Sequence, residues 1–205
     1  MKEHETREDR KKTAGRPRDA RTTEGILKAA LELGIESGFD GLTVEGVAAR
    51  AGVGKTTIYR RWPDVWSIVA DAVFADVGRI APVQERATAR ESFRVSMRLV
   101  ARSFRGRYGE ILRPLIGRAQ VDPRLRQALG KHWLSARREI SRAIVRRGVA
   151  SGELRAGLDP DIVLDALYGP LYHRLLLPYD GDGVHLSDSY IDALIDTVFG
   201  GLEAQ

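Results

Sequence analysis

The sequence predicts an all-α protein in which a short N-terminal helical unit precedes a C-terminal helical bundle. Apolar residues recur at helical spacing, as they do through residues 44–51. Two Asp-Pro pairs, at 122–123 and 159–160, each place a capping aspartate before a proline that suits the first helical position. No stretch shows the sustained apolar/polar alternation that is typical of strands.

The N-terminal part divides into an arm and a set of short helices. Residues 1–20 alternate charges without apolar periodicity, so we expect a flexible basic arm. Residues 21–78 then predict helices that run from capping residues (Thr22 or Thr23, Thr43, Asp64) to breakers such as Gly38 and Pro63. The helices expected here are 22–38, 44–51, 55–62 and 65–78.

The C-terminal part, residues 79–205, predicts a bundle that follows a connector at 79–88. Apolar periodicity, Asp-Pro starts and glycine breakers set the expected limits of its helices. These helices are 89–105, 108–119, 123–150, 160–177 and 187–201.

Composition excludes several classes of protein. Cysteine is absent, which excludes disulfides, thiolate metal sites and cysteine nucleophiles. The first residues lack the apolar core of a signal peptide, and no stretch approaches the roughly 18 apolar residues of a membrane span. We therefore expect a cytoplasmic protein that has no membrane contact.

Charge is distributed unevenly along the chain. Residues 97–155 hold 15 Lys/Arg against 4 Asp/Glu, and residues 156–205 hold 1 against 9. The arginines of the first block either form solvated helix faces or pair with the acidic C-terminal block. Residues 10–63 hold 11 Lys/Arg against 6 Asp/Glu, a smaller excess that can face phosphates.

The segment 43–63 admits two interpretations. Its Gly54-Lys55-Thr56 end matches a nucleotide-binding P-loop, G-x-x-x-x-G-K-[ST]. The first glycine of that motif is replaced by Ala49, however, and the preceding residues follow a helical period where a P-loop needs a strand. Pro63 also stops the following helix early. These departures disfavour a P-loop nucleotide hydrolase.

A helix-turn-helix accounts for more of this segment. Its shared core would comprise the apolar residues Val47, Ala51, Val53, Ile58 and Trp62. The polar residues of the second helix would then face outward, where Thr and Arg can contact bases and Lys and Tyr can contact phosphates. An ordinary helical hairpin with a solvated polar face is the alternative.

The residues of this segment resemble a known family. The pattern Thr43-Val-x-x-Val-Ala-x-x-Ala-Gly-Val-x-x-x-Thr57-Ile-Tyr59-x-x-Trp62-Pro63 is similar to the DNA-binding signature of the TetR family of bacterial transcriptional regulators. The resemblance covers residues 22–75, and runs such as Gly169-Pro170-Leu171-Tyr172 extend it weakly into the C-terminal part. It implies a repressor that a small-molecule effector releases from a palindromic operator.

Carried over by position, the resemblance implies a set of DNA-contacting residues: Thr43, Lys55, Thr56, Thr57, Tyr59, Arg60 and Arg61. Arg16 and Arg18, in the arm sequence Gly-Arg-Pro-Arg, could enter an A·T-rich minor groove if the arm is extended. One departure is Val65, where members of the family usually place a phosphate-contacting lysine. That contact is either lost or supplied by Arg60, Arg61 or the arm.

For the C-terminal part, the resemblance implies a homodimer formed through the last two helices. The dimer residues expected from their apolar stripes are Leu164, Leu167, Leu171, Leu175, Ile191, Leu194, Ile195 and Val198. The resemblance also implies an effector pocket, for which the candidate residues are Phe93, Phe104, Trp133, Tyr168, Tyr172 and His173. All of these could instead be ordinary core residues.

The sequence shows no evident cluster of metal-ligating or catalytic residues. His132 and His173 lie on different predicted helices without an acidic cluster at metal-ligand spacing, so we expect no metal and no other cofactor. No arrangement of catalytic residues stands out, and we expect no enzymatic activity. Besides the nucleotide hydrolase, the remaining alternative is a helical adaptor that has lost DNA binding, which Val65 would permit.

Overall fold

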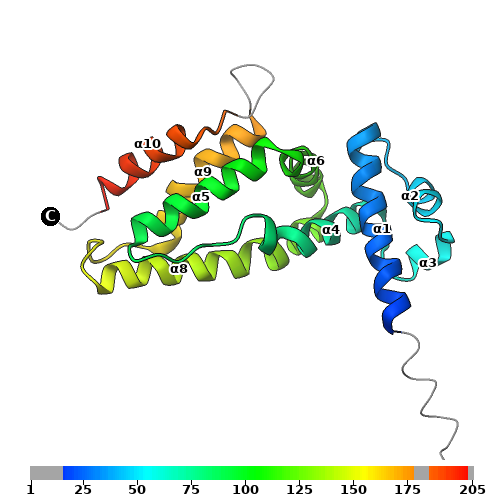
Figure 1. Cartoon of the computed structure of the whole chain (residues 1–205), viewed down its shortest axis with the longest axis horizontal. Helices are drawn as coiled ribbons and strands as arrows, with labels where there is room; N and C mark the ends of the chain where they lie inside the picture. Colours follow the sequence, from blue (N-terminus) through cyan, green and yellow to red (C-terminus); the bar gives the residue numbers. More distant parts are fainter. Residues whose placement is uncertain (1–15, 178–184, 203–205) are drawn as a thin grey trace, which may run out of the picture. The chain divides into compact units, whose positions relative to one another are not determined.

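The computed structural model describes residues 16–177 and 185–202 and is all-α over these ranges, which confirms the predicted fold class (Figure 1). The chain divides into two compact units, residues 1–72 and 73–205. The boundary falls inside helix α4, earlier than the expected boundary after residue 78. The helices are α1 (Arg16–Ser37), α2 (Val44–Ala51), α3 (Lys55–Tyr59), α4 (Val65–Ile80), α5 (Ala89–Arg105), α6 (Arg107–Val121), α7 (Pro123–Ala128), α8 (Ser135–Ala150), α9 (Pro160–Leu176) and α10 (Asp188–Phe199), with a π-helical turn, η1 (Leu129–Leu134), between α7 and α8.

Helix α1 begins earlier than the sequence predicted. It starts at Arg16, and Thr22 lies inside it. Pro17 is in the first turn, where its missing N–H leaves no helical hydrogen bond unmade. Arg16 and Arg18 therefore lie on a helix, which corrects the expectation of an extended arm there. Residues 1–15 of the expected arm, and the side chains of Arg16 and Arg18, lie outside what the structure describes.

Two of the predicted caps of the N-terminal unit, Thr43 and Asp64, are confirmed, whereas Thr22 and Thr23 lie inside α1 and do not cap it. The Thr43 hydroxyl accepts a hydrogen bond from the Gly46 amide at 3.1 Å and so caps α2. Asp64 accepts the Ser67 amide at 2.8 Å at the start of α4. At the C-terminal end of α1, Gly38 takes a φ of 85°, a conformation that glycine adopts without strain.

The long helix α1 and the short helices α2 and α3 enclose the core of the N-terminal unit. Val47 of α2, Ile58 of α3 and the following Trp62 are buried, as the helix-turn-helix interpretation requires. The Trp62 indole also donates to Asp71 of α4 at 2.7 Å. The third helix is shorter than expected because its last turn tightens, and the amides of both Arg61 and Trp62 bond to the Ile58 carbonyl.

In the C-terminal unit, the helix expected over 123–150 is interrupted by the π-helical turn η1. Asp122 caps α7 before Pro123, and Asp159 caps α9 before Pro160, as the two Asp-Pro pairs predicted. Helix α5 lies beside α9 and α10 (Figure 1). Its Phe93 and Met97 are fully buried.

Ion pairs join α5 to α10 along their length. Arginines spaced by four residues on α5 face aspartates spaced by four on α10. The pairs are Arg90–Asp196 (2.9 Å), Arg94–Asp196 (2.8 Å), Arg94–Asp192 (3.4 Å), Arg98–Asp192 (2.5 Å), Arg102–Asp188 (2.9 Å) and Arg105–Asp188 (3.4 Å). Arg138 and Arg142 of α8 similarly contact Asp161 of α9 at 2.6 and 2.9 Å. Of the two alternatives left open for the basic block, pairing with the acidic C-terminal block therefore applies to the paired arginines within residues 97–155: Arg98, Arg102, Arg105, Arg138 and Arg142.

These ion pairs predict acid sensitivity. The hydrogen bond from Arg102 is the main cause that lowers the pKa of Asp188, and hydrogen bonds from Arg142 and then Arg138 lower the pKa of Asp161. A carboxylate with a lowered folded-state pKa stabilises the fold above its unfolded pKa, and this stabilisation is lost as the pH falls. We expect the melting temperature to fall between about pH 5 and about pH 3. Thermal unfolding followed by circular dichroism measures this, and an Asp188→Asn variant with an unchanged acid dependence would contradict it.

The residues predicted for the dimer interface lie mainly in the core of the protomer. Six of the eight are almost completely buried: Leu164, Leu167, Leu171, Leu175, Ile191 and Ile195. These six side chains leave almost no surface that a second subunit could contact, and their place in a dimer interface stays a prediction. Their stripes pack inward against the rest of the bundle, as an apolar helix face also does in a monomer. Leu194 and Val198 are half-buried and remain partly accessible.

Candidate nucleic-acid interface and ligand cavity

A tight turn places α3 against α2. Gly52 takes a φ of 65°, and its amide and the Val53 amide bond back to α2 carbonyls. Only glycine adopts this left-handed conformation without strain, so it ends α2 and reverses the chain. Gly54 is then the N-cap residue of α3, in an extended conformation. The segment Gly52-Val53-Gly54 is therefore the turn of a helix-turn-helix.

This geometry excludes the P-loop interpretation. A P-loop lies between a buried strand and a helix, so that the amides of its loop surround the phosphates. Here the segment before Gly52 is α2, and the helix after it has only five residues. The alternative of a nucleotide-binding loop is therefore abandoned.

Helix α3 and the residue that follows it carry five of the nine predicted DNA-contacting side chains. Lys55, Thr56 and Tyr59 are exposed, and 53% of Tyr59 is accessible, which is unusual for a large aromatic residue. Thr57 is half-buried, and Arg60 is exposed just past the helix end. A helix with two hydroxyl groups, a cation and an accessible phenol on one side can contact base edges and phosphates.

Arg61 and Thr43 have structural partners. The Arg61 guanidinium donates to the Thr23 hydroxyl of α1 at 2.6 Å, in a partly buried position. Thr43 caps α2 through its hydroxyl oxygen, although the residue is exposed. Sequence reasoning placed both among the DNA contacts, and neither structural role prevents such a contact.

Lys55 is paired in the free protein. Its ammonium lies 3.1 Å from the Glu45 carboxylate of α2, and both side chains are 57% exposed. A backbone hydrogen bond is the main cause that lowers the pKa of Glu45, and Lys55 adds to it. Glu45 therefore stays ionised at neutral pH and competes with any phosphate for Lys55.

A cavity with a volume of about 520 Å³ lies in the C-terminal unit. Helices α6, α7, α8 and α9 and the turn η1 form its walls, which are mainly apolar. Its lining residues are Leu112, Ile116, Ala119, Gln120, Arg126, Leu129, Gly130, Trp133, Leu134, Arg138, Asp165, Tyr168, Gly169, Tyr172 and Leu176. This size falls in the roughly 300–1,000 Å³ range of small-molecule sites.

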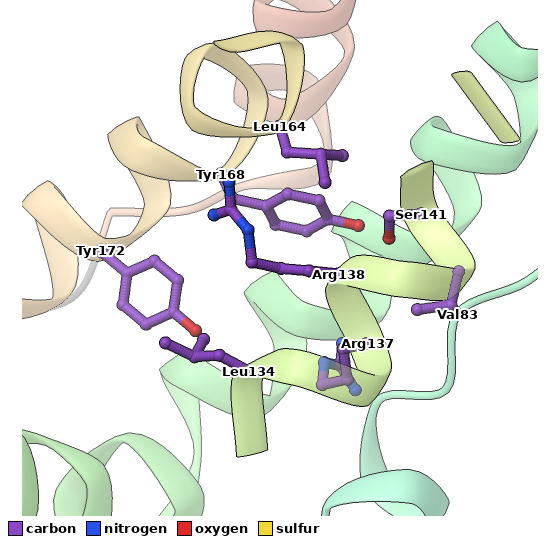
Figure 2. A pocket seen from close by; sticks show the side chains of 8 residues that line it. All are labelled: Val83, Leu134, Arg137, Arg138, Ser141, Leu164, Tyr168 and Tyr172. Carbon is purple, nitrogen blue, oxygen red and sulfur yellow. The ribbon is translucent and has the colours of Figure 1, made fainter. Parts of the chain in front are cut away.

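A second cavity of about 60 Å³ shares four residues with the first: Leu134, Arg138, Tyr168 and Tyr172. Figure 2 shows Tyr168 extending from α9 toward Ser141 of α8. The Tyr168 hydroxyl oxygen is buried, and burial raises the pKa of this group to about 12. Tyr168 therefore remains a neutral hydrogen-bonding group at any physiological pH.

The structure separates the predicted ligand-binding residues into two groups. Trp133, Tyr168 and Tyr172 line the 520 Å³ cavity together. Phe104 lines only a small void of about 20 Å³, Phe93 is fully buried in the core, and His173 is exposed and lines none of the three cavities described. Arg126 and Arg138 were not predicted from the sequence. An arginine that lines a cavity has the same sequence pattern as an arginine on a solvent-exposed helix face.

Family comparisons agree with this architecture. The model for bacterial regulatory proteins of the tetR family matches residues 26–64, and the model for the tetracyclin repressor-like C-terminal domain matches residues 83–198. The second match alone covers more than half of the chain. The chain belongs to the TetR family of bacterial transcriptional regulators.

Individual relatives of this TetR-family regulator extend over most of its length. It is 33% identical over 190 residues to the uncharacterized HTH-type transcriptional regulator YdeS of Bacillus subtilis, covering 93% of this chain and 94% of the relative. It is 29% identical over 174 residues to the DNA-binding transcriptional repressor TetR of Mycobacteroides abscessus, covering 84% and 89%. The crystal structure of the TetR family transcription regulator SCO0332 superimposes with a TM-score of 0.71 at 30% identity, covering 88% and 98%.

Two features are absent from the residues that the structure describes. No helix among them is long and apolar enough to cross a membrane. They also contain no group of three or more His, Asp or Glu side chains placed to hold a metal ion.

Proposed function

We propose that this TetR-family regulator is a homodimeric repressor that binds a palindromic operator through α3 and is released by a small molecule bound in its C-terminal unit. The observation that carries the DNA-binding part is the outward face of α3, where Lys55, Thr56 and Tyr59 are exposed beside one another. A partner surface that covers Tyr59 would explain why this large aromatic side chain is exposed in the free protein.

Arg60 is the residue best suited to replace the phosphate contact that Val65 cannot make. Val65 is half-buried at the start of α4 and has no donor. Arg61 is held by Thr23, and Arg50 by Glu36 at 2.6 Å. Arg60 is exposed at the end of α3 and has no acidic partner among the described residues.

The homodimer is supported by the family and by the need for two recognition helices. A two-fold axis would set two copies of α3 about one DNA turn, roughly 34 Å, apart. Because most of the predicted interface residues are buried, the contact would use the outward side of the same two helices. Leu194, Val198 and the 69%-exposed Ile162 offer apolar surface there.

Contacts within the C-terminal unit suggest how a ligand could affect α4. Trp133, in the cavity wall, packs against the Tyr108 ring at 6.2 Å between centroids. The Tyr108 hydroxyl donates to the Val73 carbonyl of α4 at 2.6 Å, and His132 packs against Phe74 of α4 at 5.6 Å. A ligand that moves η1 would therefore move α4, whose first half belongs to the N-terminal unit. Operator affinity would fall if the ligand favours a DNA-incompetent position of α4.

A gel-shift titration on DNA upstream of the encoding gene tests the proposal. We expect Lys55→Ala and Tyr59→Ala each to weaken binding about 10-fold or more, since such contacts contribute about 1–3 kcal/mol. Lys55→Ala should also make operator affinity less dependent on salt concentration, by about the amount that one phosphate contact contributes. Glu45→Gln should strengthen binding, because it frees Lys55 and removes a negative charge beside the DNA-facing surface.

The control is Lys28→Ala, which removes the same charge from α1, where Lys28 pairs with Glu32 at 3.7 Å. Its binding should stay within about twofold of the wild type. Equal losses in the Lys28 and Lys55 variants would show that only net charge matters. If the wild type gives no shift at low salt on any upstream fragment, the adaptor alternative gains support.

A further inference from the structure

We infer that the 520 Å³ cavity binds an apolar molecule that carries a single anionic group, with the anion at Arg126. This inference rests on the proposed ligand-sensing role of the C-terminal unit and adds the chemical class of the ligand. Three features of the cavity support it: the balance of its charges, the donors that Arg126 has left, and a glycine that keeps the cavity open.

Most charges at this cavity are neutralised within the protein. Arg138, which lines it, contacts Asp165 at 2.8 Å and Asp161 at 2.6 Å. The same network includes Arg142, Arg146 and Glu139, so three arginines face three carboxylates. The network therefore contributes no net charge to a ligand. Asp165, in particular, is occupied by Arg138 and offers little attraction to a cation.

Arg126 is the exception. Its Nε donates to the Ala119 carbonyl at 3.1 Å and one terminal nitrogen donates to the Gln120 carbonyl at 2.5 Å. These bonds fix the guanidinium at the end of α6 and use two of its five N–H donors. No carboxylate of the described residues lies within ion-pair distance of it. The cavity therefore has a net charge of about +1, held on a rigid fork that matches a carboxylate.

The rest of the lining requires an apolar body. Leu112, Ile116 and Leu129 provide aliphatic surface, and Trp133 provides an aromatic wall. An ion without an apolar portion would leave these side chains uncovered. Arg126 is exposed while it lines the cavity, so its remaining N–H donors stay open to an anionic group, and an uncharged molecule forgoes that charge-assisted hydrogen bond.

Gly130 keeps space for such a molecule. It lies in η1 on the cavity wall, and a Cβ added there would meet no atom within 4 Å. Its φ is not positive, so the backbone does not require glycine. Glycine inside a helix costs about 1 kcal/mol relative to alanine. A larger side chain at this position would extend into the cavity, which gives a way to fill it.

Isothermal titration of the full chain with three ten-carbon probes tests the inference: decanoate, decanol and decyltrimethylammonium, at neutral pH and moderate salt. We expect decanoate to bind at least about 10-fold more tightly than decanol, because a hydrogen bond to a charged group contributes about 1.5–3 kcal/mol. The cationic probe should bind more weakly than decanol. Arg126→Gln should bring decanoate and decanol to similar affinities, and Gly130→Leu should abolish binding of both.

Arg124→Gln is the matched control, since Arg124 is an exposed arginine of the same helix and does not line the cavity. It should preserve the preference for decanoate. Equal affinities of decanoate and decanol for the wild type, no effect of Arg126→Gln, or no binding of any probe would each overturn the inference. Release of the operator by an uncharged or cationic molecule that Gly130→Leu blocks would overturn it too, while leaving the proposed ligand-sensing function intact.

Discussion

Replacing Trp62 by alanine is expected to unfold the N-terminal unit and abolish DNA binding. Trp62 is 4% exposed, and its indole donates to Asp71 at 2.7 Å, so the change removes a core side chain and a hydrogen bond together. Truncation of a buried aromatic residue costs about 3–5 kcal/mol. A unit of this size has a free energy of unfolding of only about 4–10 kcal/mol. Amide hydrogen exchange of α1, α2 and α3 measures the loss.

Tyr59→Ala provides the contrast, because Tyr59 lies three residues away and is 53% exposed. We expect this variant to lose operator binding while its amide protection and melting temperature stay close to those of the wild type. If Trp62→Ala retains protected amides in α2 and α3, the indole is not the centre of this core. If Tyr59→Ala also unfolds the unit, its loss of binding says nothing about DNA contacts.

The N-terminal unit could be predicted closely because its limits are set by local chemistry. Thr43 and Gly52 each have one preferred position at a helix end, and the structure places them there, whereas α3 ends at Tyr59, before Pro63. The start of α1 could not be predicted in this way. Proline is compatible with both an extended arm and a first helical turn, so Pro17 does not distinguish them.

The C-terminal unit was predicted less well because burial depends on tertiary packing. The stripe of Leu164, Leu167 and Leu171 is apolar whether it faces the same chain or a second one, and the structure shows that it faces the same chain. The turn η1 was also inaccessible to sequence reasoning, since the same residues can form an α-helix. Without η1, the directions of Trp133 and Leu134 into the cavity could not be derived.

One feature of the C-terminal unit could have been found. Arginines recur every four residues on α5, and aspartates recur every four residues on α10. Such spacing places each set on one helix face, and opposite charges on two faces predict that the faces pair. The net charge of the two blocks alone does not identify the partner helix.

Gly109→Ala is expected to destabilise the C-terminal unit by about 3 kcal/mol. A Cβ at this position would lie 2.0 Å from the Phe104 carbonyl oxygen and 2.8 Å from its carbonyl carbon. Both are backbone atoms at the end of α5, so the clash cannot be relieved by a change of rotamer. Helix α6 would have to move away from α5. Urea unfolding followed by circular dichroism measures the change in the free energy of unfolding.

Gly117→Ala on the same helix separates this clash from the effect of the substitution itself. A Cβ at Gly117 would meet nothing within 4 Å, so alanine should stabilise the unit by up to about 1 kcal/mol as the better helix former. If the change in the free energy of unfolding has opposite signs in the two variants, the close approach of α5 and α6 is the cause of the destabilisation in Gly109→Ala. Because α6 carries Leu112 and Ile116 of the cavity wall, a displaced α6 should also weaken decanoate binding in Gly109→Ala. Equal unfolding midpoints for both variants would show that α5 and α6 do not approach closely at Gly109.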